Sequence, residues 1–439
     1  MGPLSRKGLM MPITPSRRTF IRQVSGGLIG SWLLTSLPES ARGAYLIAAD
    51  DPVAPDDLHF WNQVRDQFPL SHDRVYFNNG TIGPSPFAVR DAVKAAIDST
   101  EKSGENYGGD DVRGKLATFV GAKESELAMT HNVTEGINIV AWGLPLNRGD
   151  EVIITTHEHA GNALPWLNRA KLDGIVLKTL IPAQTAAENL NRINDLITPA
   201  TRVIAVPHIT CTDGHVLPVK EIAALARDKR IWTCFDGAHG PGMLPLDFHA
   251  MGCDTYAACC HKWMCGPKGT GFVYISEAML DVLQARWIGA YSDTGWDVTV
   301  NPPELKQYVP TAHRFDYGTQ NVALQIGVGA TVDFLHHIGM ENITKRITSL
   351  ATLLRSELAA LGNGIEILTP EEESSRAAMI GFKLKSMPFD AFAQGAAARG
   401  FRIRQVPENH LNSIRISTHL YNNADEVHKF IDVVKDCMK

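Results

Sequence analysis

The sequence predicts an α/β protein with two domains. A large domain is built on a mostly parallel sheet covered by helices, and a smaller C-terminal domain is α+β. Two observations lead to this fold class. Between residues 75 and 275, short and continuously apolar runs alternate with helical patterns, which is typical of parallel strands buried on both faces. From about residue 321 the pattern changes to two long helical runs, several short strands and a final helix.

The elements follow in chain order from these patterns. After a linker and N-terminal segment at residues 46–74, the large domain is assigned to residues 75–310. We expect its strands at residues 126–130, 150–156, 174–180, 201–209, 230–236, 255–260 and 269–276, and helices at 134–144, 161–172 and 219–229. The small domain is assigned to residues 311–439. We expect its helices at residues 322–336, 343–361 and 424–436, and its strands at 365–370, 377–385, 401–406 and 413–418.

The first 45 residues have the pattern of a twin-arginine export signal. The run "SRRTFIR" at residues 16–22 precedes the moderately apolar run "VSGGLIGSWLLTSL", and the small-residue stretch "ARGA" follows. A chance Arg-Arg pair before a short apolar helix is the alternative. The joint pattern favours export to the periplasm by the twin-arginine machinery, which carries folded proteins.

Composition excludes several classes of protein. The net charge is -5 and no basic stripe is present, so we expect no nucleic-acid partner. No internal run reaches the roughly 18 apolar residues of a transmembrane helix. Six of the seven cysteines lie between Cys211 and Cys265, several of them on apolar runs, so we expect buried thiols rather than a disulfide framework.

The most unusual stretch is "ACCHKWMCGPKGTGFVYIS", in which Lys262 lies in apolar surroundings. It could be an ordinary lysine at a buried edge, a neighbour of a Cys/His metal site, or a catalytic amine that carries a Schiff base. The metal site would draw on His261 and the nearby cysteines. However, no C-x2-C pair exists, and adjacent cysteines on a strand point to opposite faces, so we expect no metal.

A pyridoxal-phosphate site needs three further parts: a carboxylate at the pyridine nitrogen, a ring that stacks on the pyridine, and phosphate donors at a helix N-terminus. Asp236 follows a buried strand, where α/β sheets present ligand groups, although an Asp-Gly pair is also common in turns. His159 is the candidate ring, and a surface loop or a metal pair with His157 is the alternative. Thr134 begins a helix, where a plain N-cap would look the same.

The order of the motifs "TEGIN", "EHAGNALPW", "DGAHGPG", "HKWMCGPKGTGF", "FDYGTQN" and "RIS…YN" resembles the class-V aminotransferase family. These are fold-type-I pyridoxal-phosphate enzymes, and they include cysteine desulfurases and isopenicillin-N-epimerase-like proteins. The similarity extends from about residue 75 to the C-terminus. It implies the fold-type-I architecture and pyridoxal 5′-phosphate as the cofactor.

The resemblance also implies roles for individual residues. Lys262 would be the Schiff-base lysine and would move the proton at the substrate carbon, Asp236 would pair with the pyridine nitrogen, and His159 would stack on the ring. His239 stands where desulfurases usually have glutamine, near the ring hydroxyl. The remaining cofactor contacts would be Val133, Thr134, Cys211, Cys259, His261 and Thr319. Among these, Cys211 replaces the desulfurase asparagine and Cys259 stands at a position that is often serine.

Substrate and partner contacts follow from the same resemblance. Arg415 would bind the substrate carboxylate as a bidentate clamp, Arg404 is a second candidate for an anion, and Asn79 is assigned to the substrate. For the two arginines, an exposed sheet edge is the alternative. Thr319 would reach the cofactor phosphate of the partner subunit, which implies a homodimer.

The function expected from these features is a periplasmic pyridoxal-phosphate enzyme acting on an amino acid or a peptide-bound amino acid. Desulfurases carry a nucleophilic cysteine on the loop after the position of Arg404, and here "QVPENHLNS" has none, so we do not expect a typical desulfurase. Tailoring of a secondary metabolite, such as the siderophore pyoverdine, fits an exported member. The alternatives are an epimerase or carbon–sulfur lyase on a free amino acid, and a non-catalytic module that binds the cofactor or another ligand.

Overall fold

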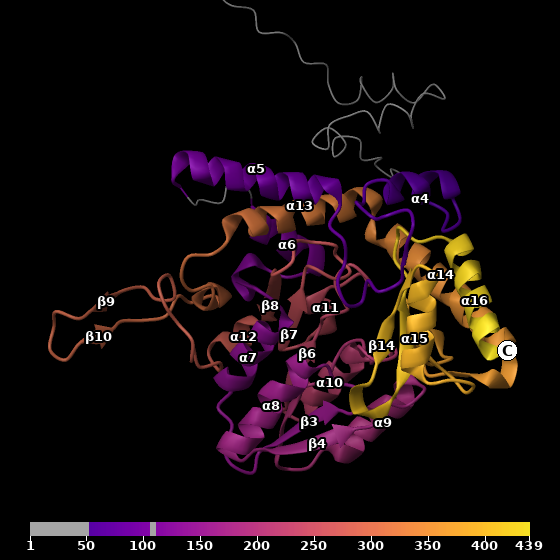
Figure 1. Cartoon of the computed structure of the whole chain (residues 1–439). Coiled ribbons are helices and arrows are strands. Elements are labelled where there is room, and N and C mark those ends of the chain that lie inside the picture. The colour runs from indigo at the N-terminus through magenta and orange to yellow at the C-terminus, as the bar shows by residue number, and fades with distance from the viewer. Residues whose placement is uncertain (1–51, 106–110) are drawn as a thin grey trace, which may run out of the picture.

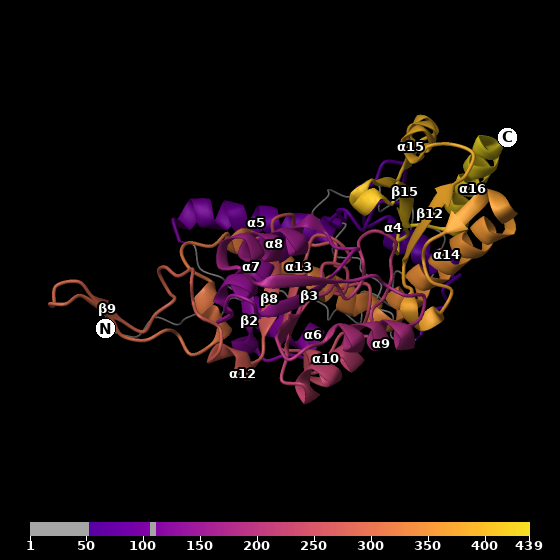
Figure 2. The same ribbon diagram turned by 90° about the horizontal axis from the view of Figure 1, so that it is seen from below.

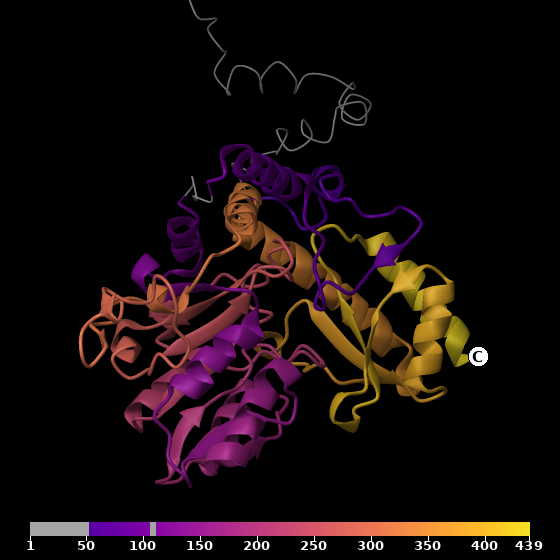
Figure 3. The same ribbon diagram turned by 60° about the vertical axis from the view of Figure 1, so that its left-hand side comes forward.

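The computed structural model describes residues 52–105 and 111–439 (Figure 1). The twin-arginine pattern at residues 1–45 lies outside the described residues, so the export signal stays a prediction. The described chain forms a larger α/β unit and a smaller α+β unit, which lie beside each other (Figure 3). The predicted fold class is confirmed.

A seven-stranded sheet in the order β2-β8-β7-β6-β5-β3-β4 is the centre of the larger unit. Its strands are β2 (Leu127–Thr130), β3 (Glu151–Thr155), β4 (Val176–Leu180), β5 (Thr201–Ile204), β6 (Trp232–Asp236), β7 (Thr255–Cys259) and β8 (Gly271–Ile275). Neighbours from β7 to β4 run parallel, whereas β8 is antiparallel to both β7 and β2. The connection 260–270 contains no crossover helix, so β8 returns antiparallel. This connection carries Lys262.

Helices cover both faces of this sheet, as the apolar strands require. The helices of the larger unit are α4 (Leu58–Arg65), α5 (Phe87–Ser103), α6 (Val112–Val120), α7 (Val133–Gly143), α8 (Ala160–Asp173), α9 (Ala186–Leu196), α10 (Val219–Asp228), α11 (Phe248–Met251) and α12 (Glu277–Leu280). Neighbouring strand residues enter opposite cores: Phe235 and Tyr256 pack with α6 and α10, whereas Cys234 and Ala257 pack with α7 and α8. The expected continuous burial is therefore confirmed for β6, β7 and β8, whereas the edge strand β4 is only partly buried.

The smaller unit has an antiparallel sheet in the order β11-β12-β15-β14. Its strands are β11 (Ile365–Ile367), β12 (Met379–Leu384), β14 (Arg404–Val406) and β15 (Ser413–Ser417), and its helices are α14 (Met340–Ala360), α15 (Phe389–Ala398) and α16 (Ala424–Met438). The short strands β1 (Val75–Tyr76) and β13 (Phe401–Arg402) pair in parallel and attach the N-terminal segment to this unit.

Helix α13 (Val322–Ile338) lies beside α5 along one side of the molecule (Figure 1). Its residues Val328, Val332 and Leu335 belong to the core of the larger unit rather than to that of the smaller one. The helix follows residue 311 in the chain but packs with the larger unit. The expected domain boundary at residue 311 stays a prediction.

A long hairpin, with β9 (Trp296–Asp297) and β10 (Glu304–Leu305), projects from the larger unit, opposite the smaller one (Figure 2). Large apolar side chains on and near this hairpin are exposed, including Trp287, Tyr291, Trp296 and Val298. Within residues 52–105 and 111–439, no helix has the length and apolar character needed to cross a membrane.

Candidate active site

A cavity of about 250 Å³ opens at the carboxyl edge of the large sheet, where the parallel strands end. It is lined by Gly80, Thr81, Asn132, Val133, Thr134, His159, Gly161, Cys211, Asp236, Ala238, His239, Cys259, His261, Lys262, Arg404 and Arg415. Of the site residues expected from the sequence, Asn79 and Thr319 do not line it. The structure therefore brings the others together from segments of both units.

Lys262 lies in the connection between β7 and β8, and its Nζ is 3.5 Å from Nε2 of His239. The backbone behind it is closely packed: a Cβ on Gly83 would come within 2.1 Å of the Lys262 carbonyl oxygen. Asn79 is fully buried there. Its Nδ2 donates to the Lys262 carbonyl at 3.4 Å and its Oδ1 accepts from the Tyr421 hydroxyl at 3.0 Å. Asn79 thus supports the lysine backbone, and its expected contact with the substrate stays a prediction.

The N-terminus of α7 faces the cavity and forms an anion site. Asn132, which is not among the residues expected from the sequence, is the N-cap, and its side chain accepts the N–H of Glu135. Thr134 is therefore inside the first turn and is not the cap. The first N–H groups of a helix have no intrahelical acceptor, so those of Val133 and Thr134 can donate to a phosphate. The motif "THNVTEG" contains the signal for this cap, because asparagine is a preferred N-cap residue.

Close approach of α8 to α7 requires a glycine at residue 161. A Cβ there would lie 2.5 Å from Thr134 Oγ1 and 3.1 Å from His159 Nδ1. His159 is the N-cap of α8, and its Nδ1 accepts the N–H of Gly161 at 3.0 Å. Burial, and next the charge of Lys262, lowers the pKa of His159 below its usual value. The ring is therefore neutral near pH 7 and is free to stack on an aromatic ligand.

His157 does not join His159 in a metal pair. Its Nε2 lies 3.7 Å from the carboxylate of Asp213. Among the residues that the structure describes, no three His, Cys, Asp or Glu side chains are grouped to hold a metal ion. Cys259 and Cys260 belong to opposite cores of the sheet, as their adjacent positions on a strand require.

Asp236 is the last residue of β6 and is 5% exposed. Its Oδ1 accepts the N–H of Ala238 at 2.9 Å, so the turn that follows the strand holds the carboxylate in place. A second buried carboxyl, Glu158, lies nearby. Burial is the main cause that raises the pKa of Glu158 to about 8, and the charge of Asp236 adds to it. Asp236 can thus hold a protonated ring nitrogen at the carboxyl end of its strand.

The two arginines differ in their surroundings. Arg415, on β15, is 1% exposed, and it donates to the Cys211 carbonyl at 2.6 Å and to Thr81 Oγ1 at 3.1 Å. Its Nε is buried and has no partner, and no carboxylate within the described chain forms an ion pair with it. Burial lowers the pKa of Arg415. Arg404, on β14, is half-buried, donates to the same carbonyl and is paired with Glu408.

These surroundings bear on the alternative of an exposed sheet edge, because β15 is an inner strand and β14 is the edge strand of its sheet. Arg415 is buried rather than at an exposed edge, it lines the cavity, and its buried Nε has no hydrogen-bond partner in the described chain. Arg404 already has a carboxylate from its own loop. Thr81 and Glu408 could not be selected from the sequence, because their contacts to the arginines depend on tertiary packing.

The thiols in and around the cavity are buried, as expected from their apolar runs. Cys211, Cys234, Cys253, Cys259, Cys260 and Cys265 are all free and buried. Burial raises the pKa of the two thiols that line the cavity, Cys211 and Cys259, to about 11. The Cys259 thiol donates to the Ala238 carbonyl. His261 also lines the cavity, and its Nδ1 is 3.3 Å from the Thr270 carbonyl.

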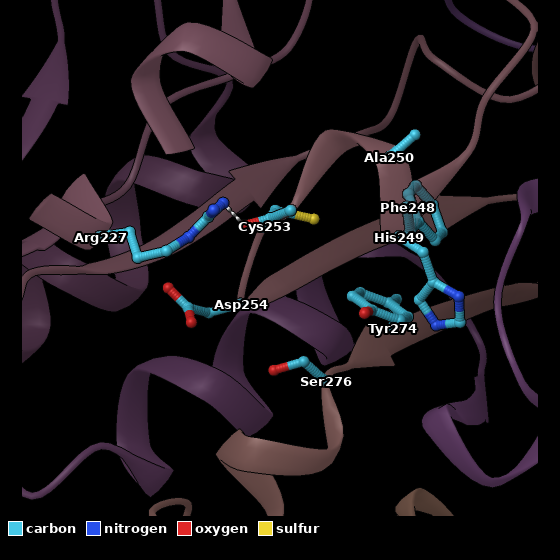
Figure 4. Close-up of a pocket in the computed structure, with 9 residues that line it drawn as sticks. Arg227, Phe248, His249, Ala250, Cys253, Asp254, Tyr274 and Ser276 are labelled. Carbon is cyan, nitrogen blue, oxygen red and sulfur yellow. Dashed lines mark hydrogen bonds between the residues drawn. The ribbon is translucent and has the colours of Figure 1, made fainter. Parts of the chain in front are cut away.

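A second hollow lies at the opposite edge of the sheet, where Asp254 precedes β7 and Ser276 follows β8 (Figure 4). Its polar side chains are already used within the protein. Arg227 donates to the Gly252 carbonyl, Asp254 accepts from the backbone and hydroxyl of Thr233, and His249 is paired with Glu126. This hollow contains no group comparable to Lys262 or Arg415.

Comparisons with known proteins agree with this site. The chain is 28% identical to isopenicillin N epimerase of Amycolatopsis lactamdurans over 86% of this chain and 99% of that protein. It is 30% identical to a probable cysteine desulfurase of Methanothermobacter thermautotrophicus, over 83% of this chain and 94% of that protein. A solved structure of a C-DES mutant has glycine covalently linked to its PLP cofactor. It superposes on this chain with a TM-score of 0.77 at 25% sequence identity, and the match covers 85% of this chain and 99% of that one.

A second structure of C-DES is described as a cystine C-S lyase in complex with cysteine persulfide, its reaction product. It superposes equally well, over 84% of this chain and 99% of that one. The residues of the cavity fit pyridoxal phosphate: a helix N-terminus with a glycine-dependent approach, a carboxylate at a strand end, a neutral imidazole and a lysine amine. Pyridoxal phosphate, the cofactor expected from the sequence, is thereby confirmed. The family model for Aminotransferase class-V matches residues 98–430, and the chain belongs to this family.

Proposed function

We propose that this protein is a pyridoxal-phosphate-dependent enzyme that acts at the amino-bearing carbon of an amino acid or a peptide-bound amino acid. One observation carries the proposal. A single cavity holds the amine of Lys262, the carboxylate of Asp236 and the buried guanidinium of Arg415, whose Nε has no partner. When bound at Lys262, the cofactor supplies an electron sink for the carbanion that forms at the substrate carbon.

Residues of the chain would hold the cofactor and move the proton at the substrate carbon. When the cofactor is bound, the N–H groups at the start of α7 would bind its phosphate and Asp236 would hold the proton on its ring nitrogen. Neutral His159 would stack on the ring. The amine of Lys262 takes and returns the proton at the substrate carbon, a task for which a flexible primary amine next to a neutral imidazole is suited.

Arg415 selects substrates that carry a carboxylate next to the amine. Its Nη1 and Nη2 are held by the Cys211 carbonyl and by Thr81, which fixes the plane of the guanidinium. Nε is buried and has no partner in the protein, and we propose that it donates to the substrate carboxylate. A buried guanidinium without a carboxylate is costly, so binding of a carboxylate is strongly favoured there.

The persulfide mechanism of cysteine desulfurases needs a nucleophilic cysteine, and the corresponding loop of this chain has none. The loop at residues 407–412 contains no cysteine. The cavity thiols of Cys211 and Cys259 have raised pKa values, so only a very small fraction is thiolate at pH 7. We therefore propose a reaction other than desulfuration, although the curated relatives include proteins named cysteine desulfurase. The likeness to the cystine lyase C-DES and to isopenicillin N epimerase favours carbon–sulfur lysis or epimerisation of a free amino acid as the second candidate.

A homodimer is part of the proposal. The hairpin with β9 and β10 exposes Trp287, Tyr291, Trp296 and Val298 to solvent in the single chain, and exposed apolar patches of this kind mark protein interfaces. Thr319 is exposed and does not line the cavity of its own chain. A second copy that covers the hairpin is the occupant we propose, with Thr319 directed to the phosphate of the partner.

Export gives the reaction its setting. The twin-arginine pattern supports a periplasmic enzyme, loaded with cofactor before export. A transaminase depends on a supply of keto acid that is found in the cytoplasm, so a self-contained reaction suits an exported enzyme better. Tailoring of a secondary metabolite, such as the glutamate side chain of the siderophore pyoverdine during its maturation, is the role we propose.

Spectroscopic titration with candidate substrates tests the proposed activity. Free amino acids, cystine, and peptides with a free or side-chain amino acid group are added to the purified holoenzyme, and the visible band and the products are followed. We expect at least one class to change the band and to turn over. Lys262→Ala should lose turnover, whereas Lys429→Ala, which alters an exposed lysine on α16 of the smaller unit, should keep it. A Lys262→Ala variant that retained the full function of the protein in cells would point to a non-catalytic binding module instead.

A further inference from the structure

Trp263 directly follows Lys262, and its buried indole contacts His239. The indole Nε1 donates to Nδ1 of His239 at 3.0 Å, and both side chains are almost inaccessible to solvent. An indole N–H is a donor only, so Nδ1 must present its lone pair. A neutral imidazole with a lone pair on Nδ1 carries its proton on Nε2. The contact therefore determines which nitrogen of His239 is protonated.

His239 is held in the neutral form as well. Burial is the main cause that lowers its pKa well below the usual value, and the charges of Lys262, Arg415 and Arg404 act in the same direction. Asp236 is the carboxylate in the same cavity. The indole N–H of Trp263 points at Nδ1 of His239. A proton on Nδ1 would therefore place two N–H donors opposite each other, which is unfavourable.

The protonated nitrogen faces the reaction site. Nε2 of His239 is 3.5 Å from Nζ of Lys262, and both residues line the cavity. An N–H at this position can donate to a neutral amine or to an anionic oxygen, but it opposes an ammonium group. The cavity thus has one defined hydrogen-bond donor beside Lys262, the Nε2–H of His239.

Trp263 cannot easily turn away from His239. Its ring stacks on His419, with centroids 5.3 Å apart and planes inclined by 23°, and its carbonyl lies 3.0 Å from Nε2 of His419. Nδ1 of His419 accepts the N–H of Leu420, so Nε2 of His419 is the donor to that carbonyl. Tyr421 stacks on the other side of His419 at 5.2 Å. The array holds the indole in position.

We propose that Trp263 is a positioning residue that fixes the tautomer of His239, so that Nε2 of His239 donates to the acceptor atom of the cofactor ring beside Lys262. This inference rests on the proposed function. The resemblance to desulfurases implies glutamine at the position of His239. A glutamine needs no neighbour to fix its protonation. Its donor and acceptor are different atoms, whereas an imidazole exchanges these roles when one proton moves.

A double-mutant cycle in the holoenzyme tests the assignment. The visible band of the bound cofactor is titrated between pH 6 and 10 in wild type, Trp263→Phe, His239→Gln and the double variant. The Nε2–H of His239 donates a hydrogen bond, so it stabilises the deprotonated form of the bound cofactor and lowers the midpoint of the titration. Trp263→Phe should therefore raise the midpoint by about one pH unit, the shift that corresponds to one hydrogen bond to a charged group. His239→Gln should keep the midpoint of wild type, and the double variant should match His239→Gln.

Trp142→Phe is the matched control, since it removes an indole donor to the Asn138 amide and should leave the midpoint unchanged. If Trp263→Phe does not fold, His239→Leu, which removes the donor, should raise the midpoint in the same way. A 15N spectrum of the histidine-labelled holoenzyme should show His239 with an unprotonated Nδ1.

An unchanged midpoint in Trp263→Phe or His239→Leu, the same shift in the glutamine background, or a protonated Nδ1 would overturn the assignment. These results differ from a failure of the proposed function, in which wild type itself would take up no pyridoxal phosphate and show no band.

Discussion

Replacement of Arg415 by lysine gives the most specific test of how the cavity selects its substrate. Lysine keeps the positive charge and offers three donors for the acceptors that Arg415 uses, the Cys211 carbonyl and Thr81. It lacks the planar fork, and with it the Nε donor that has no partner in the protein. The loss of one charge-assisted hydrogen bond to a substrate carboxylate costs about 2 kcal/mol, which is roughly a 30-fold loss of affinity.

The assay compares an amino acid with the amine that lacks its carboxylate. Each is titrated into the holoenzyme, and the change of the visible band gives the Kd. For Arg415→Lys we expect the Kd of the amino acid to rise about 30-fold, whereas the Kd of the amine should stay within about twofold of wild type. Arg404→Lys is the control, and because Arg404 is already paired with Glu408, its effect on the amino acid should be smaller. Equal losses for amine and amino acid would refute the assignment of Arg415 to the carboxylate.

Three further predictions concern the cofactor site, acid stability and assembly. Gly161→Ala should weaken binding of pyridoxal phosphate at least tenfold, measured by equilibrium dialysis, because the added Cβ would lie 2.5 Å from Thr134 Oγ1. Burial lowers the pKa of His419 to about 4, below its unfolded value of 6.5, so the unfolded state binds the extra proton first and stability should fall between pH 6.5 and 4. His419→Gln should reduce the slope of denaturant midpoint against pH in that range, and an unchanged slope would count against this cause. Trp296→Lys, in the exposed hairpin, should shift the protein toward monomer in sedimentation experiments, whereas an unaltered dimer would place the interface elsewhere.

The sequence predicted those parts of the site that follow from strand ends. Asp236 ends β6, and His159 and Lys262 lie on the connections after β3 and β7, so the alternation of strands and helices was enough to place them at one edge of the sheet. The mostly parallel order was predictable for the same reason. The antiparallel strand β8 follows from the short connection that precedes it.

Other parts could not be predicted, because they depend on contacts between distant segments. Arg415 donates to the carbonyl of Cys211, which lies 204 residues away in the chain. A backbone carbonyl has no signature in the side-chain sequence. The pairing of Arg404 with Glu408 depends on how the loop after β14 turns back, and three residues of that loop, including Asn409, have positive φ. The contact between Trp263 and His239 likewise appears only in the folded chain.

Reduction with borohydride followed by mass mapping is the most direct test of the central claim. The visible spectrum of the purified protein is recorded before and after reduction, and the modified peptide is then identified. We expect a yellow protein whose band disappears, with the reduced pyridoxyl group on Lys262. A colourless protein that takes up no added pyridoxal phosphate, or a label on another lysine with Lys262 unmodified, would contradict the account.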